Sequence, residues 1–266
     1  MMMIFRKMHG LGNDFIILDG RKNPIPLTPQ DIQGMSDRRR GVGCDQFIVM
    51  EPSHVADVFM RIYNPDGSEA GACGNATRCV ADIILTETGR DQCVVETISG
   101  HLPSRWVAGG LIEVDMGEPR LLWNQIPITS EMDTLHLPLS GDPVAVNMGN
   151  PHCVFFVDDL DQVDVTTWGG SVEKDALFPQ KTNVEFVQIL SRTHVRMRVW
   201  ERGAGITQAC GSGACAVGVA AIRRGLTDRD ITVSLDGGDL RIHWRETDGH
   251  VLMTGAITYV FEGRFF

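Results

Sequence analysis

The chain has 266 residues, of which 43% are hydrophobic and 22% are charged, a composition typical of a globular protein with a sizeable core. Its formal net charge of −10 and its lack of a long Lys- or Arg-rich face argue against nucleic acid as the main partner. No stretch reaches the roughly 18 consecutive apolar residues of a membrane helix, and Met1–Asp19 lacks the apolar core of a secretory signal. We therefore expect a cytoplasmic protein that binds neither nucleic acid nor membranes.

The first half of the chain predicts two helices and several strands. A peripheral helix is expected after Thr28, because Thr28-Pro29-Gln30-Asp31 supplies an N-cap, a proline at the first position and an acid at the third. A second helix is predicted from Asn75 to about Thr88, closed by Gly89. Period-two patterns predict strands at Phe15–Leu18, Phe47–Met50, Val58–Tyr63, Val94–Ile98 and Ile112–Met116.

The second half follows Arg120–Asp133, which has no counterpart elsewhere in the chain and is expected to hold a linker. Its main helix is predicted from Ser212 to about Arg224, closed by Gly225. Interior glycines cost this helix about 1 kcal/mol each relative to alanine, so they indicate close backbone packing. The strand candidates of this half are Cys153–Val157, Val184–Ile189, Val195–Trp200, Ile231–Leu235 and Val251–Thr254.

The two halves align when the sequence is shifted by the 137 residues that separate Cys73 from Cys210. Equivalent segments then occur in the same order and almost without gaps, which predicts a duplicated unit. We expect an α+β fold of two similar, pseudo-symmetric domains, each a strand-rich, barrel-like layer around a central helix, with a site in the cleft between them. The predicted lobes are residues 1–118 and 119–256, with a C-terminal strand at 257–266 returning to the first lobe. The superposed segments are Gly12-Asn13 on Gly149-Asn150, Val58–Asn64 on Val195–Glu201, Ala72–Gly74 on Ala209–Gly211 and, with one further residue of shift, Gly100, Leu102 and Trp106 on Gly238, Leu240 and Trp244.

Two of the seven cysteines stand out, because Cys73 and Cys210 each precede a glycine at the start of a predicted central helix. The odd number of cysteines and the absence of a C-x-x-C pair disfavour a disulfide framework or a zinc ribbon. A helix N-terminus favours a thiolate, lowers the Cys pKa from about 8.5 and offers N–H groups to a ligand carboxylate. Two such thiols on opposite faces of one carbon would suit inversion of a stereocentre, one acting as base and the other as acid.

Polar residues also fall at equivalent points of the repeat. Any one of them could be a turn residue or a cap, but together they form a symmetric set around two helix ends, which favours ligand binding. The symmetry is broken where Asn64-Pro65 corresponds to Glu201-Arg202. An added Glu and Arg could hold a second ammonium and a second carboxylate, which predicts a substrate with amino-acid character at both ends. The symmetric pairs are Asn13 with Asn150, Gln46 with Asn183, and Asn64 with Glu201.

These residues closely resemble the diaminopimelate epimerase family over nearly the whole chain. Ala76 replaces a glycine that is common after Cys-Gly-Asn, and Phe261 falls where many members have a tyrosine at the dimer contact. The matching segments are His9–Phe15, Gly43–Gln46, Asn64–Glu69, Ala72–Asn75 with Arg78, Met148–Cys153, Asn183 and Glu201–Ala216.

The resemblance implies an isomerase that needs no pyridoxal phosphate, metal or other cofactor and converts LL- to meso-2,6-diaminopimelate for lysine and peptidoglycan synthesis. It implies that Cys73 and Cys210 are the base and the acid, and that His152 and Glu201 tune the two thiols. Family members are typically homodimers whose lobes close on the substrate, with Phe261 at the dimer contact here. The resemblance places the substrate-binding groups at Asn13, Gln46, Asn64, Asn150, Asn183, Glu201 and Arg202, and the helix-end groups at Gly74, Asn75, Gly211 and Ser212.

Two alternative functions remain open from the residues alone. A racemase of the same architecture could act on a monoamino acid such as proline or histidine, although Glu201-Arg202 disfavours this. A redox-switch or metal-binding protein could instead use the pairs Cys73/Cys79 and Cys210/Cys215. Oxidation of facing Cys73 and Cys210 to a disulfide is a further expectation, since it would stop turnover until reduction.

Overall fold

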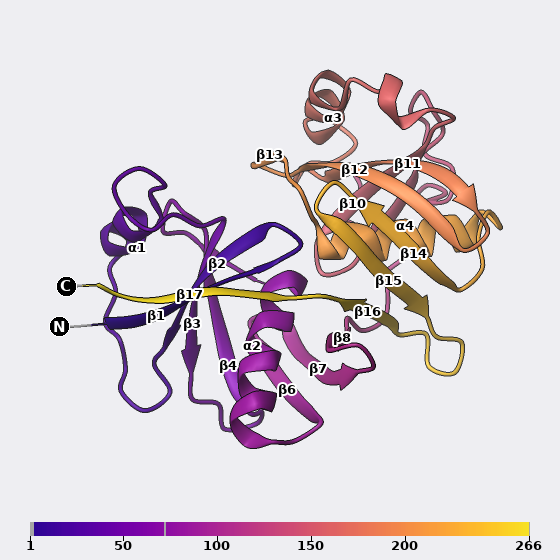
Figure 1. The fold of residues 1–266 in the computed structure, drawn as a ribbon. Coiled ribbons are helices and arrows are strands. Elements are labelled where there is room, and N and C mark those ends of the chain that lie inside the picture. Colours follow the sequence, from indigo (N-terminus) through magenta and orange to yellow (C-terminus); the bar gives the residue numbers. More distant parts are fainter. Residues whose placement is uncertain (1–2, 72, 266) are drawn as a thin grey trace. The chain divides into compact units, whose positions relative to one another are not determined.

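The computed structural model describes residues 3–71 and 73–265, and the chain divides into two compact units (Figure 1). Unit 1 comprises Met1–Val114 and Gly255–Phe266, and unit 2 comprises Asp115–Thr254. The lobes expected from the sequence, residues 1–118 and 119–256 with a returning strand at 257–266, remain a prediction. Ala72, which belongs to the repeated motif, lies outside the described residues.

Unit 1 is a mixed sheet in the order β17-β1-β2-β3-β4-β6-β7-β8, with the short β5 added at the end of β4. The pairs β2–β3 and β4–β6 are parallel and the other pairs are antiparallel. The strands are β1 (Met3–Gly10), β2 (Asn13–Asp19), β3 (Gln46–Glu51), β4 (Val58–Tyr63), β5 (Glu69–Ala70), β6 (Gln92–Thr97), β7 (Gly100–Val107), β8 (Leu111–Asp115) and β17 (Thr258–Phe265).

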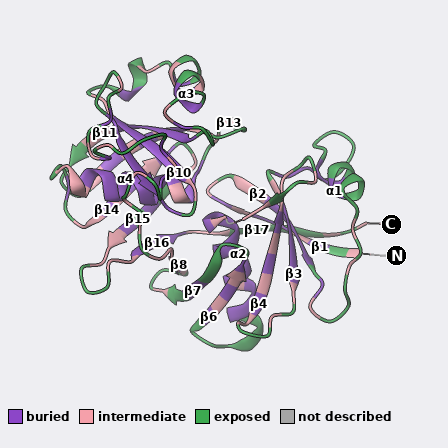
Figure 2. Ribbon diagram, turned by 180° about the vertical axis from the view of Figure 1, so that it is seen from behind, coloured by how far each residue is buried: buried purple, intermediate pink, exposed green. Residues whose placement is uncertain are grey.

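Two helices complete unit 1, and both are where the sequence predicts them. The peripheral α1 (Pro29–Ser36) begins with a capping box between Thr28 and Asp31. The central α2 (Gly74–Thr88) has Cys73 as its N-cap and ends at Gly89, whose φ of 67° is the left-handed conformation that glycine adopts without strain. Most of α2 is buried, and it packs against β1, β6 and β7 (Figure 2).

Unit 2 repeats this topology in the order β9-β10-β11-β12-β14-β15-β16, with β13 added at the end of β12. The parallel pairs are β10–β11 and β12–β14, which correspond to β2–β3 and β4–β6, so the predicted two-part α+β fold is confirmed. The elements are β9 (Val144–Asn147), β10 (Pro151–Phe156), a 3-10 turn (Leu160–Gln162), α3 (Val165–Glu173), β11 (Asn183–Ser191), β12 (His194–Glu201), β13 (Gly205–Ile206), α4 (Gly211–Arg223), β14 (Asp230–Leu235), β15 (Gly238–Trp244) and β16 (Val251–Gly255).

The central helix of unit 2, α4, packs against β9, β10, β11, β14 and β15. Its glycines allow the close packing that the sequence predicts. A Cβ atom on Gly218 would lie 2.8 Å from Cγ2 of Ile242, and one on Gly213 would lie 2.8 Å from Oε1 of Glu185. Within the described part of the chain, every helix is too short or too polar to cross a lipid bilayer.

Candidate active site

The strand register of unit 1 gathers its polar site residues at one edge of the sheet. Asn13 begins β2 and Gln46 begins the parallel neighbour β3, where Gln46 lies opposite Phe15. Phe47 pairs with Tyr63 in the antiparallel β3–β4 ladder, so Asn64 follows β4 beside Gln46. Sequence reasoning grouped these residues by the repeat, and the ladder explains why they share an edge.

The thiol of Cys73 belongs to the same edge of unit 1. Its Sγ accepts the backbone N–H of Ala76 at 3.5 Å, as an N-cap does, and lies 3.9 Å from Oδ1 of Asn13. Nδ2 of Asn75 donates to the same Asn13 oxygen at 3.1 Å. The first turn of α2, with Gly74 as its first residue, is therefore linked directly to the first residue of β2.

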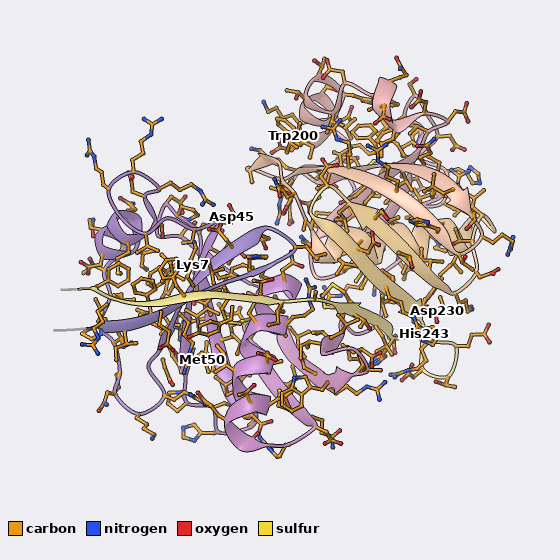
Figure 3. All side chains as sticks on the ribbon, in the orientation of Figure 1. Lys7, Asp45, Met50, Trp200, Asp230 and His243 are labelled. Atoms are coloured by element: carbon orange, nitrogen blue, oxygen red, sulfur yellow. The ribbon has the colours of Figure 1, made fainter. Side chains whose placement is uncertain are left out.

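A cluster of charged residues, not foreseen from the sequence, fixes the amide of Asn13. Nδ2 of Asn13 donates to Oδ2 of Asp45 at 3.0 Å, and Arg38 bonds both Asp45 and Asp14 at 2.6–2.7 Å. Lys7 donates to the Asp14 carboxylate and to a backbone carbonyl. Lys7 and Asp45 are labelled in Figure 3. Burial opposes ionisation of Asp14, but the hydrogen bonds from Arg38 and Lys7 outweigh it and lower its pKa. Asn13 is thus held by an ionised network that leaves its oxygen facing Cys73.

Unit 2 shows the corresponding edge. Asn183 begins β11 opposite His152 of β10, and Glu201 ends β12, where it follows the Val184–Trp200 pair. Asn183 is buried, and its side chain is bonded to backbone: Nδ2 donates to the carbonyl of Pro151 and Oδ1 accepts the N–H of Arg202, each at 2.9 Å. In this structure Asn183 therefore orients the turn that carries Arg202, while a contact with substrate remains a prediction.

Cys210 occupies the N-cap position of α4, without a capping hydrogen bond from its side chain, and is only 5% exposed. Its Sγ lies 3.6 Å from the hydroxyl of Ser212, next to Gly211. Burial raises the pKa of Cys210 well above its ordinary value, and the negative charges of Glu201 and Glu185 raise it further. The expectation that the helix end lowers this pKa is wrong for Cys210, because loss of hydration and two nearby carboxylates outweigh the helix dipole.

Glu201, the predicted partner of this thiol, is itself in a poorly hydrated site. Burial raises its pKa, whereas hydrogen bonds from Thr207 and Cys210 and the charge of His152 act in the opposite direction without reversing the shift. A carboxyl group with a raised pKa next to a thiol with a raised pKa is suited to exchanging a proton with it.

Glu185 is a residue that the sequence analysis missed. It is fully buried on β11, and its Oε1 lies 2.6 Å from Nδ1 of His152, which is also fully buried. Nε2 of His152 lies 2.8 Å from Oδ1 of Asn150. The close approach of Gly213 to both Glu185 and Sγ of Cys210 places this pair beside the second thiol. The signal in the sequence was a glutamate within the apolar stretch Val184–Ile189, since a glutamate there must have a partner.

The remaining predicted residues lie at the surface. Arg202 is exposed, and its Nη1 donates to the carbonyl of Gln180 at 3.1 Å. Phe261 on β17 is 45% exposed and packs edge-on against Phe5 at 5.9 Å between ring centres. Among residues 3–71 and 73–265, no group of three or more His, Cys, Asp and Glu side chains is arranged to hold a metal ion.

Comparison with known proteins identifies the family. The family model described as diaminopimelate epimerase matches residues 5–122 and 144–260. The chain is 55% identical to the diaminopimelate epimerase of Rhodospirillum centenum, covering 97% of this chain and 91% of that protein, and 52% identical to that of Gluconobacter oxydans, covering 99% of each.

Similar folds occur among solved structures at low sequence identity. A phenazine biosynthesis protein of the PhzF family from Bacillus anthracis gives a TM-score of 0.72 at 17% identity, covering 100% of this chain and 99% of that chain. A hydroxyproline epimerase from Agrobacterium vitis gives a TM-score of 0.68 at 13% identity, covering 99% and 92%. With the family model matching both halves and relatives more than 50% identical over nearly the full length, the chain belongs to the diaminopimelate epimerase family, a family of isomerases.

Proposed function

We propose that the chain is a cofactor-independent epimerase that interconverts LL- and meso-2,6-diaminopimelate, with Cys73 and Cys210 as its two acid–base groups. One observation carries the proposal: each unit places a cysteine at the N-cap of its buried central helix, at the sheet edge where its polar residues gather. The names of the relatives supply the substrate. The proposal includes a role in lysine and peptidoglycan synthesis.

In the proposed reaction the two thiols approach the α-carbon from opposite faces. The raised pKa of Cys210 keeps its proton on sulfur at rest, so Cys210 enters the first turnover as the acid. Cys73 then acts as the thiolate base: it takes the α-proton, and Cys210 delivers its own proton to the other face. In the reverse direction the two roles are exchanged, with Glu201 as the group next to Cys210 that shares its proton.

Backbone groups at the helix ends would stabilise the intermediate. Negative charge develops on the α-carboxylate as the proton leaves, and the free N–H groups of a helix N-terminus favour that charge. Arg202 would hold the carboxylate at the far end of the substrate, while Glu201 stays beside Cys210. The helix-end groups that we assign to this role are Gly74 and Asn75 in unit 1 and Gly211 and Ser212 in unit 2.

Proton exchange in deuterated water tests reaction class and substrate together. The purified protein is incubated with diaminopimelate and, separately, with proline, histidine and other amino acids, and deuterium at the α-carbon is followed by NMR or mass spectrometry. We expect exchange and epimerisation of diaminopimelate alone. Exchange of a monoamino acid without exchange of diaminopimelate would support the alternative racemase and contradict our assignment.

Substitution of either thiol tests the two-base mechanism. We expect Cys73→Ser and Cys210→Ser each to lower kcat at least about a thousandfold, because a hydroxyl is a much weaker acid and base than a thiol. Cys93→Ala is a suitable control, since Cys93 is buried on β6 and takes no part in the proposal. Wild-type turnover by either serine variant would exclude that cysteine as a proton carrier.

The same proposal includes a cytoplasmic location and a homodimer. Cys44, Cys79, Cys93, Cys153 and Cys210 are free thiols, in keeping with a reducing compartment. The support for a dimer is the exposed apolar side chains of Tyr259, Val260 and Phe261 on β17.

A further inference from the structure

Glu173 lies where α3 meets the turn after β12. It is the last residue of the helix and only 4% exposed. Its Oε2 accepts the indole N–H of Trp200 at 2.8 Å, and its Oε1 accepts the backbone N–H of Gly203 at 3.1 Å. One carboxylate thus bonds the residue two places before Arg202 and the residue directly after it.

The packing around Trp200, which is labelled in Figure 3, reinforces this connection. A Cβ atom on Gly169 would lie 2.5 Å from Cβ of Trp200, and one on Gly170 would lie 3.4 Å from its Cζ2. The first distance would be a clash and the second an ordinary contact, so only position 169 requires a residue without a side chain. Gly169, which is unfavourable in a helix, therefore has a packing reason, and it brings Glu173 within reach of the turn.

The turn itself carries two residues of the proposed substrate site, Glu201 and Arg202. It is closed by a hydrogen bond from the N–H of Ala204 to the carbonyl of Glu201 at 3.1 Å. Burial opposes ionisation of Glu173, but the hydrogen bonds from Trp200 and Gly203, with the charges of Lys181 and Lys174, outweigh it, and the pKa of Glu173 is lowered. The group that holds the turn is therefore a carboxylate, able to accept from both donors at once.

Unit 1 offers an internal comparison. There the peripheral helix α1 also contacts the turn after β4, but through an amide: Nε2 of Gln33 donates to the carbonyl of Asp66 at 2.7 Å. That turn carries Asn64-Pro65 and no arginine. The carboxylate bond from the peripheral helix thus occurs in the unit whose turn carries an arginine.

We propose that Glu173 is a positioning residue for substrate specificity: it fixes the turn after β12 so that Arg202 is held ready for the second carboxylate of the substrate. Glu173 does not touch the reacting carbon and acts through the turn. The inference rests on the proposed function, since it requires that Arg202 binds the second carboxylate of diaminopimelate.

Glu173→Gln tests this directly. A glutamine has one acceptor oxygen, so its NH₂ group must face either the Trp200 indole or the Gly203 amide, and one bond is lost. The ion pair of Oε1 with Nζ of the exposed Lys181, 3.7 Å apart, is lost as well. We expect KM for diaminopimelate to rise about tenfold, the effect of losing one hydrogen bond to a charged group, while kcat stays within about twofold. Asp164→Asn is the matched control: it removes a carboxylate that caps the same helix at its exposed N-terminus, and KM should not change.

A second variant keeps the test decisive if Glu173→Gln folds poorly. Trp200→Phe removes the indole donor and leaves Glu173 intact, and we expect a smaller rise in KM. In the double variant the glutamine oxygen can turn to Gly203, so KM should not exceed that of Glu173→Gln alone. Wild-type KM in both single variants, an equal fall in kcat, or a double variant whose effect is the product of the single effects would overturn the proposal.

NMR separates this inference from the proposed function. The indole N–H of Trp200 and the amide N–H of Gly203 report the carboxylate in the absence of any substrate. We expect both signals to shift in Glu173→Gln and to stay in place in Asp164→Asn, and unchanged signals in Glu173→Gln would contradict the inference. If the wild-type protein did not exchange the α-proton of diaminopimelate, the proposed function would be wrong. The two NMR signals would still test the hydrogen bonds of Glu173.

Discussion

At the residue scale, the environment of Cys210 shows two opposing influences on one thiol. A helix N-terminus stabilises an anion by about 0.3–1 kcal/mol, whereas removing an anion from water without a cationic partner costs several kcal/mol. Cys210 is 5% exposed and is influenced by Glu201 and Glu185, both of which are acidic. Burial and the two carboxylates thus outweigh the helix end and keep the thiol protonated.

Buried thiols also predict how stability depends on pH. Burial raises the pKa of Cys93 to about 12 and that of Cys153 and Cys210 well above the ordinary value. The folded state therefore holds these protons more tightly than the unfolded state. The stabilisation is complete below the unfolded thiol pKa of about 8.5 and is lost as pH rises above it.

We accordingly expect the free energy of unfolding to fall between about pH 8.5 and 10.5, by up to about 1.4 kcal/mol per pH unit for each of these thiols. Tm should fall with it over the same range. Calorimetry across this range measures the slope. Cys93→Ala should have a shallower slope, because it has one thiol fewer to ionise on unfolding. A slope that is the same in wild type and Cys93→Ala would show that other groups control alkaline unfolding.

At the element scale, the effect on stability of replacing a helix glycine by alanine depends on the space around that glycine. A Cβ atom added to Gly218 of α4 would lie 2.8 Å from Ile242, whereas one added to Gly34 of α1 would have nothing within 4 Å. Alanine is favoured over glycine in a helix by about 0.5–1 kcal/mol. Whether that gain is realised depends on the space available.

We expect Gly34→Ala to raise the free energy of unfolding by about 0.5–1 kcal/mol and Gly218→Ala to lower it by about 1–3 kcal/mol, because the added methyl must displace Ile242. Urea unfolding of both variants measures the difference. Each substitution is the other's control for the general effect of alanine in a helix. Stabilisation by Gly218→Ala would show that α4 moves easily away from β15.

The helices and strands differ in how well the sequence predicts them. Strands with one buried face, such as Val58–Tyr63, alternate clearly, and α1 and α2 carry their caps in the sequence. Helix α3 was missed because Val165–Glu173 combines β-branched residues with two glycines, which are poor helix formers. It is stabilised by the Asp164 cap and by packing against Trp200, and tertiary contacts of that kind leave no local pattern.

The candidate site shows the same division. The repeat identified Cys73, Cys210 and the polar residues at the strand ends, because duplication places them at equivalent positions. Residues that act through a neighbouring side chain have no similar residue at the equivalent position of the other half, so the repeat did not reveal them. They are Asp45 beside Asn13, Glu185 beside His152, and Glu173 beside Trp200.

At the scale of the whole molecule, the duplication conserves topology more than chemistry. Both units share the order of parallel and antiparallel pairs and a cysteine-capped central helix. Their polar networks differ: Asn13 is held by an ion cluster, while His152 and Glu185 form a buried pair. The two units thus share one fold while differing in the polar groups beside their cysteines.

The outer strand of unit 1 gives the last prediction. β17 pairs with β1 and with no other strand of unit 1 in the described residues. Its consecutive side chains Tyr259, Val260 and Phe261 are 46%, 50% and 45% exposed, so apolar groups are accessible on both of its faces. An exposed apolar edge strand favours pairing with a second copy of the chain, which a two-fold axis would satisfy symmetrically.

We expect a dimer by light scattering at micromolar concentration and a monomer after Phe261→Glu, because the substitution buries a charge in the interface of both copies at once. Ile98→Glu is the matched control, since Ile98 is 56% exposed and lies outside β17. If Ile98→Glu alone dissociated the dimer, the contact would involve the β6–β7 turn instead of β17. If neither variant changed the mass, Phe261 would have no role in association, and its exposure would have to be explained within a single chain.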